Sequence, residues 1–113
     1  MSGEYIHFRE PMDFEKWLLA RAFASASNVD PNRFGQILVC PMDDGGMGSL
    51  RLWSAGVNMN DRQFGSVVSQ YSFADSDGVE VLVELIFDSE GLPYELDVWK
   101  TDFSPLVSPN SRS

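Results

Sequence analysis

The chain contains one cysteine and one histidine among its 113 residues. A single cysteine excludes an internal disulfide, and Cys40 follows an apolar run in which a small buried side chain is expected. A cysteine nucleophile needs a histidine partner, and His7 stands near the N-terminus without a companion motif. We therefore expect Cys40 to be structural, and no cysteine–histidine site.

Long hydrophobic runs are also lacking. No apolar stretch approaches the roughly 20 residues that span a bilayer, and the first residues lack the basic and apolar regions of a signal peptide. We therefore expect a cytoplasmic location.

Basic residues are scarce: 8 Lys and Arg stand against 17 Asp and Glu, giving a net charge of −9. Such a surface repels phosphate groups, so we expect binding to neither nucleic acid nor a membrane. The same charge favours encounter with a basic protein, although it also serves solubility alone.

Apolar residues make up 43% of the chain, enough for one core. We expect a single domain over residues 1–107 and a flexible polar tail over residues 108–113. Residues 11–26 predict the main helix, with Pro11 suited to its first turn and an apolar stripe at helical spacing. That stripe consists of Phe14, Trp17, Leu18 and Ala22.

Strand patterns fill the rest of the chain. Residues 34–42 and 49–53 predict a hairpin around a glycine-rich turn, and residues 64–73 predict a weaker strand. The strongest alternation covers residues 79–87 and 94–99, joined by a turn at residues 88–91. The predicted fold class is α+β, with an N-terminal helix packed on an antiparallel meander sheet of about five strands.

The last hairpin has a predicted register. A turn of two or four residues places Val81 and Leu96 on one face, whereas a three-residue turn would put the apolar sets out of phase. The opposite face then carries Glu80, Glu84, Glu95, Asp97 and Trp99. We expect the helix to cover Trp99; the alternative is an exposed aromatic, a candidate binding hot spot.

Glu84, Glu95 and Asp97 form a predicted acidic cluster on that face. Such a cluster serves as a metal site, an acid–base pair or a docking patch for cations. The simplest alternative is a solvated face whose charges are neutralised by neighbouring bases. The bases available are Arg51, Arg62 and Lys100.

Two turns partly resemble ligand-binding loops. The loop at residues 43–48 is rich in glycine, but it lacks the Lys-Ser/Thr ending of a phosphate loop and carries Asp43 and Asp44. We interpret it as a hairpin turn whose apolar tip, Met47, suits protein contact. The turn at residues 75–78 begins like a calcium loop but has no glutamate at the twelfth position, so turn chemistry explains it better.

Two segments resemble a known family. These are Met-Asp-Asp-Gly-Gly-Met-Gly-Ser-Leu at residues 42–50 and Tyr-Glu-Leu-Asp-Val-Trp-Lys-Thr-Asp-Phe-Ser-Pro-Leu at residues 94–106. They resemble an uncharacterised family of small bacterial proteins, a domain of unknown function, over most of the chain. The resemblance implies no activity and no catalytic residue. In charge and architecture the chain is also similar to the immunity proteins of bacterial toxin systems.

These observations predict a non-enzymatic protein-interaction domain without a cofactor. Its most concrete form is an immunity-like inhibitor that binds a basic toxin through an acidic sheet face. The predicted partner-binding residues are Asp43, Asp44, Met47, Glu84, Glu95, Asp97, Trp99 and Lys100. The alternatives are a self-associating homodimer and, less favoured, a carboxylate-based metal-binding protein.

Overall fold

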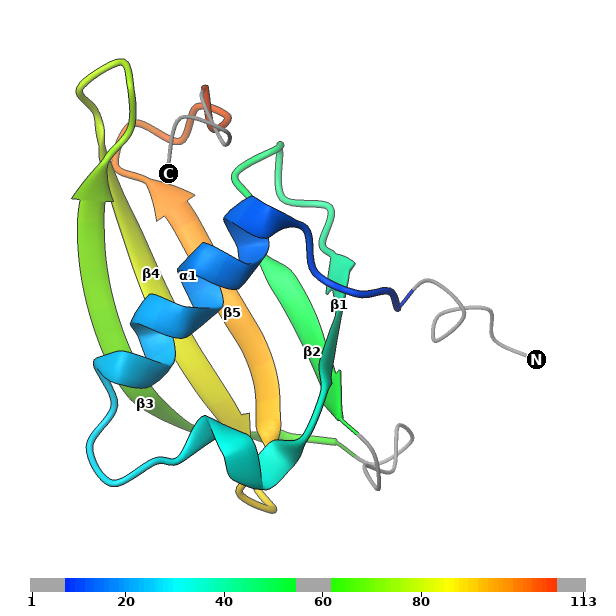
Figure 1. The fold of residues 1–113 in the computed structure, drawn as a ribbon. Helices are drawn as coiled ribbons and strands as arrows, with labels where there is room; N and C mark the ends of the chain where they lie inside the picture. Colours follow the sequence, from blue (N-terminus) through cyan, green and yellow to red (C-terminus); the bar gives the residue numbers. More distant parts are fainter. Residues whose placement is uncertain (1–7, 55–61, 108–113) are drawn as a thin grey trace.

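A computed structural model describes residues 8–54 and 62–107. Its elements are α1 (Asp13–Ala24), the 3-10 helix η2 (Pro31–Phe34), and strands β1 (Ile37–Pro41), β2 (Leu50–Ser54), β3 (Phe64–Ala74), β4 (Glu80–Asp88) and β5 (Pro93–Lys100). The strands form one five-stranded antiparallel sheet with α1 across one face (Figure 1). This confirms the α+β class. The predicted polar tail and most of the loop after β2 lie outside the described residues.

The strand order is β1-β2-β5-β4-β3. Strands β3, β4 and β5 form a meander, and the β1–β2 hairpin lies against β5 through the pairs Leu50–Leu96 and Arg51–Glu95. The sheet is therefore not the simple sequential meander that was expected. Strand β3, which follows β2 in the sequence, lies at the opposite edge of the sheet, and β5 takes the place beside β2. Side-chain alternation determines which residues face the core, but it does not determine which strands become neighbours.

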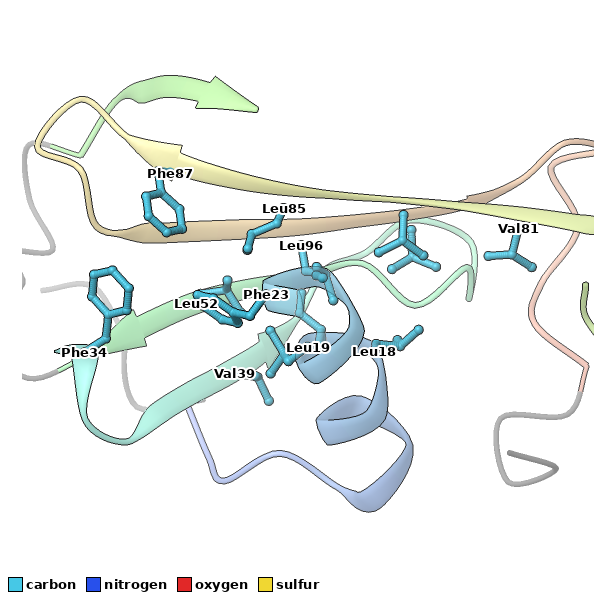
Figure 2. Close-up of a cluster of buried hydrophobic side chains, with 14 residues drawn as sticks. Leu18, Leu19, Phe23, Phe34, Val39, Leu52, Val81, Leu85, Phe87 and Leu96 are labelled. Carbon is cyan, nitrogen blue, oxygen red and sulfur yellow. The ribbon is translucent and has the colours of Figure 1, made fainter. Parts of the chain in front are cut away.

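The core lies between α1 and one face of the sheet. Figure 2 shows the helix side chains Leu18, Leu19 and Phe23 directed towards apolar side chains of the strands. The strand side of this core is Val39, Leu50, Leu52, Val81, Val83, Leu85, Phe87, Leu96 and Val98. Leu18 and Ala22 of the predicted stripe are buried, whereas Phe14 and Trp17 are only partly buried, at its margin.

The β4–β5 register agrees with the prediction. Residues 89–92 form the connection, and the paired residues include Leu82–Trp99, Glu84–Asp97 and Ile86–Glu95. Val81 and its alternating partners face α1, so the carboxylates and Trp99 lie on the opposite face. The expectation that the helix covers Trp99 was wrong, because α1 packs on the face that carries Val81, Leu85 and Leu96.

Candidate functional site

The face of the sheet turned away from α1, here called the open face, collects most of the predicted site. No helix among residues 8–54 and 62–107 covers it; α1 and η2 lie on the other side of the sheet (Figure 1). By register its residues are Leu38, Cys40, Arg51, Trp53, Val67, Gln70, Ser72, Ala74, Glu80, Leu82, Glu84, Ile86, Glu95, Asp97 and Trp99. Glu84, Glu95, Asp97 and Trp99 are each partly buried, so the face mixes charge with apolar surface.

Three carboxylates lie at the centre of the open face. Glu84 is paired with Asp97 across β4 and β5, and Glu95 lies on the same face of β5 as Asp97 and opposite Arg51 of β2. Burial raises the pKa of Glu95, and the charge and hydrogen bond of Asp97 raise it further, while Arg51 and Arg62 act in the opposite direction. Burial and Asp97 therefore disfavour the charged form of Glu95, and a cation placed beside these carboxylates would favour it.

Aromatic and aliphatic side chains border these carboxylates. Trp99 is paired with Leu82, and Trp53 is paired with Leu38 near the β1 edge. Within the described part of the chain, the buried indole Nε1 of Trp53 has no hydrogen-bond acceptor. Tryptophan is enriched among the residues that carry most of the binding energy at protein interfaces, so these two side chains are candidate anchors. Cys40 also lies here, partly buried rather than in the core.

Arg62, one of the predicted neutralising bases, has a structural role. Its Nε donates to Asp88 Oδ2 at 2.9 Å, its Nη1 donates to Leu52 O at 2.6 Å, and its Nη2 donates to Pro93 O. The guanidinium also lies 5.0 Å from the centroid of the Tyr94 ring, and its side chain is only 8% exposed. Arg62 thus joins β2, β4 and β5 where their hydrogen-bonded pairing ends.

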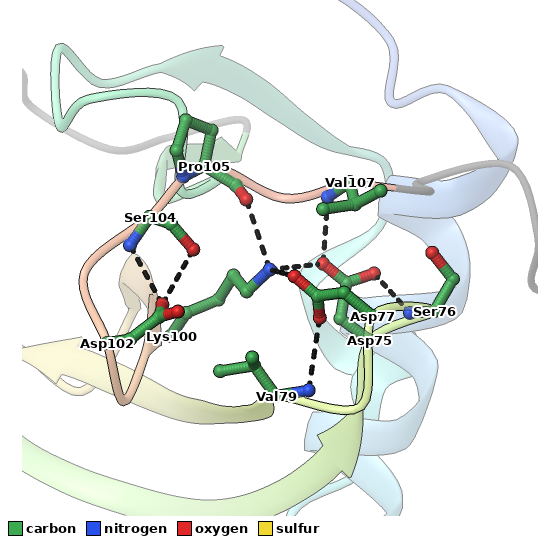
Figure 3. A network of polar contacts seen from close by, with 9 residues as sticks. All are labelled: Asp75, Ser76, Asp77, Val79, Lys100, Asp102, Ser104, Pro105 and Val107. Atoms are coloured by element: carbon green, nitrogen blue, oxygen red, sulfur yellow. Dashed lines mark hydrogen bonds and ion pairs between the residues drawn. The ribbon is translucent and has the colours of Figure 1, made fainter.

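Lys100 does not belong to the open face. Its Nζ donates to Asp75 Oδ2 at 3.0 Å, to Asp77 Oδ2 at 2.6 Å and to Pro105 O at 3.3 Å (Figure 3). Burial lowers the pKa of Lys100, but the hydrogen bonds and charges of Asp77 and Asp75 outweigh burial and raise it. The side chain is 0% exposed. Lys100 therefore forms buried ion pairs, and the prediction that it contacts a partner directly was wrong.

The turn at residues 75–78 carries this network. Asp77 accepts from the backbone of Val79 at 3.0 Å, as turn chemistry predicts, and Gly78 has a φ of +83°. Asp75 Oδ2 also accepts from the backbone of Val107 at 2.8 Å, so the turn fixes the chain after β5. Sequence reasoning missed this site. The available signal was Lys100 itself, a charged residue in the series Leu96, Val98 that faces the core.

The loop at residues 43–48 is the predicted hairpin turn between β1 and β2. Asp44 accepts backbone hydrogen bonds from Met47 at 3.1 Å and Ser49 at 2.9 Å. Gly46 O accepts from Leu106 N at 3.1 Å, so the segment after β5 packs on the loop. Met47 is partly buried rather than an exposed tip, while Asp43 is exposed. The loop extends beyond the strands, so Asp43, Asp44 and Met47 are not brought together with Glu84.

A separate groove of about 690 Å³ lies between α1, η2 and β1. Its lining is mostly apolar, with Leu19, Phe23 and Ile37 among small and polar residues, and includes no histidine, cysteine or serine of the described chain.

In residues 8–54 and 62–107, no group of three or more His, Cys, Asp or Glu side chains lies where it could hold a metal ion. No helix in these ranges is long and apolar enough to cross a membrane.

Comparison with known proteins adds a family without an activity. Residues 8–110 match a family model described as a domain of unknown function (DUF6984). No curated protein and no solved structure matched the chain significantly.

Proposed function

The chain belongs to the DUF6984 family, and we propose that it is a non-enzymatic interaction domain that binds a basic protein surface through the open face. The observation that carries the proposal is the register of β2, β5 and β4. It places Glu84, Glu95 and Asp97 side by side on a face that no described helix covers.

Charge complementarity supports a cationic partner. The chain has a net charge of −9, and burial together with the neighbouring Asp97 raises the pKa of Glu95 and so disfavours its charged form. Arginine or lysine side chains of a partner would relieve this repulsion by pairing with the carboxylates. Trp99, paired with Leu82 beside them, supplies an apolar anchor.

In its most specific form the proposal makes the partner a basic bacterial toxin and the chain its immunity-like inhibitor in the cytoplasm. Small size, acidity and an acidic face that no helix of the described residues covers support this form. Co-expression with a candidate basic toxin tests it: the wild-type chain restores growth, and Glu95→Lys does not. Equal protection by Glu95→Lys would remove the open face from the interaction.

The general proposal is tested with a defined cationic probe. Fluorescence anisotropy measures binding of a labelled peptide that alternates arginine and leucine, with a glutamate–leucine peptide as the negative probe. The variant Glu84→Gln/Asp97→Asn removes two charges from the open face, and Glu10→Gln/Glu90→Gln removes two exposed charges elsewhere. We expect the first variant to bind about tenfold more weakly, a change of about 1.4 kcal/mol, and the second to bind nearly as well as wild type. Equal losses in both variants would show only non-specific attraction and would overturn the proposal.

A further inference from the structure

The two edges of the sheet differ in how they are protected. On the β1 side, the backbone of Arg9 forms hydrogen bonds of 2.9 and 2.8 Å with Val39, and the strand ends at Pro41, which has no N–H to donate. Paired backbone and proline both protect an edge strand from pairing with another chain.

The β3 edge has no such protection. This strand has 11 residues, none of them charged, and no further strand lies beside it among the described residues. Asp75 donates its backbone N–H to Val79 O at 3.0 Å, and antiparallel alternation then directs the backbone groups of Gln70, Ser72 and Ala74 away from β4. These three residues are exposed. A row of outward backbone groups is a template for pairing.

Irregularity is confined to the first part of β3. Register shifts occur between Phe64 and Ser66 and between Val67 and Ser69, whereas residues 69–74 pair regularly with β4. Bulges protect an edge by twisting it, so only residues 69–74 offer a straight template.

α1 holds this template in place. Tyr71 Oη donates to Leu18 O at 2.8 Å, and Ser69 Oγ donates to Ala22 O at 2.7 Å. A pre-ordered strand loses little conformational entropy when it pairs.

Aromatic side chains lie beside the same stretch. Trp17 contacts Phe73 edge-to-face at 5.1 Å between ring centroids and stacks on Phe14 at 5.8 Å. Together with Tyr71, these rings remain only partly buried. They supply apolar surface that a neighbour across the edge would cover.

From these features we infer that a second copy of the chain pairs antiparallel with β3 about a two-fold axis at Ser72. Gln70 then lies opposite Ala74 of the partner subunit, and Tyr71 lies beside Phe73 of the partner subunit. The stretch is self-complementary, because its facing residues, 70–74, are all uncharged. The two five-stranded sheets become one continuous sheet.

Sedimentation equilibrium of the full chain tests this inference. We expect wild type and the control Ser72→Ala to sediment as twice 12.6 kDa at about 100 μM. Ser72→Pro removes an outward N–H without removing a β3–β4 hydrogen bond, and it should sediment as the monomer. Ser72→Lys, which places a charge on the edge, serves as a second variant if circular dichroism shows that the proline variant is unfolded.

Wild type that stays monomeric over this range would overturn the inference. A dimer that Ser72→Lys leaves intact would overturn it as well. Ser72 lies opposite Leu82, on the β3 side of the open face. Because all Ser72 variants retain Glu84, Glu95 and Asp97, failure of this experiment does not decide the proposed function.

Discussion

Two of the charged side chains of strand β5, Lys100 and Glu95, lie in opposite electrostatic settings. Lys100 is enclosed, and its charge is matched by Asp75 and Asp77 within 3.0 Å. Glu95, on the other face, lies beside a like charge in Asp97, and its pKa is raised by burial and by that neighbour. The first residue is placed for stability. The charged form of the second is disfavoured by its surroundings, as often happens at residues of binding sites.

Glu95→Gln should therefore stabilise the protein at neutral pH. The folded-state pKa of Glu95 lies above its ordinary value of 4.5, so folding favours the protonated, neutral side chain. The contribution of that neutral form to stability is complete below the ordinary pKa and is lost as pH rises through the folded pKa. Glutamine is neutral at every pH and does not lose it. We expect the melting temperature to rise by about 2–4 °C at pH 7, a figure reduced for solvent screening. The gain should vanish below about pH 4. Calorimetry measures the melting temperature at both pH values. The control variant Glu90→Gln, in the exposed turn after β4, should leave the melting temperature unchanged at both. A lower melting temperature for Glu95→Gln at pH 7 would contradict this account.

At the scale of elements, the β1–β2 turn and the chain after β5 stabilise each other. Gly48 has a φ of +103°, and a Cβ there would lie 2.8 Å from Leu106 Cδ1. Gly45 has a φ of +76° with nothing within 4 Å of its Cβ position. The two glycines share the strained backbone and differ in the contact.

Gly48→Ala should therefore destabilise the protein more than Gly45→Ala. We expect a loss of about 2–3 kcal/mol for Gly48→Ala, from backbone strain and the displaced Leu106, and about 1 kcal/mol for Gly45→Ala, from strain alone. Urea unfolding at equilibrium measures both. Equal losses would mean that the contact between the turn and Leu106 contributes nothing.

Local patterns predicted the elements better than their partners. The alternation around Val81 and Leu96 predicted the register of β4 and β5, and Glu84, Asp97 and Trp99 share a face as expected. The covered face was not predictable, because the stripe on α1 would suit either side; Leu19 and Phe23, outside that stripe, complete the contact.

Long-range contacts account for what was missed. The position of β5 between β2 and β4 depends on pairing across the whole chain. The role of Lys100 depends on Asp75, 25 residues earlier. Contacts between residues so far apart in the sequence leave no periodic pattern from which either the strand order or the ion pair could be predicted.

At the scale of the whole molecule, the two proposed surfaces are separate. The cationic partner uses the open face at β2, β5 and β4, and the second copy uses the outer edge of β3. Pairing at the edge leaves Glu84, Glu95 and Asp97 uncovered, so a dimer presents two acidic faces. The net charge of −9 favours the first interaction and opposes the second.

Salt should therefore shift the two interactions in opposite directions. Raising NaCl from about 50 to about 500 mM screens both the attraction to a cationic peptide and the repulsion between two acidic copies. We expect the Kd for the arginine–leucine peptide to rise about tenfold and the dimer dissociation constant to fall about threefold. Anisotropy and sedimentation equilibrium measure the two constants on the same samples. The monomeric Ser72→Pro variant should keep the wild-type Kd for the peptide at each salt concentration, because it retains Glu84, Glu95 and Asp97. Loss of peptide binding by this folded variant would show that the surfaces are coupled, whereas a dimer that weakens with salt would mean that ion pairs hold it together.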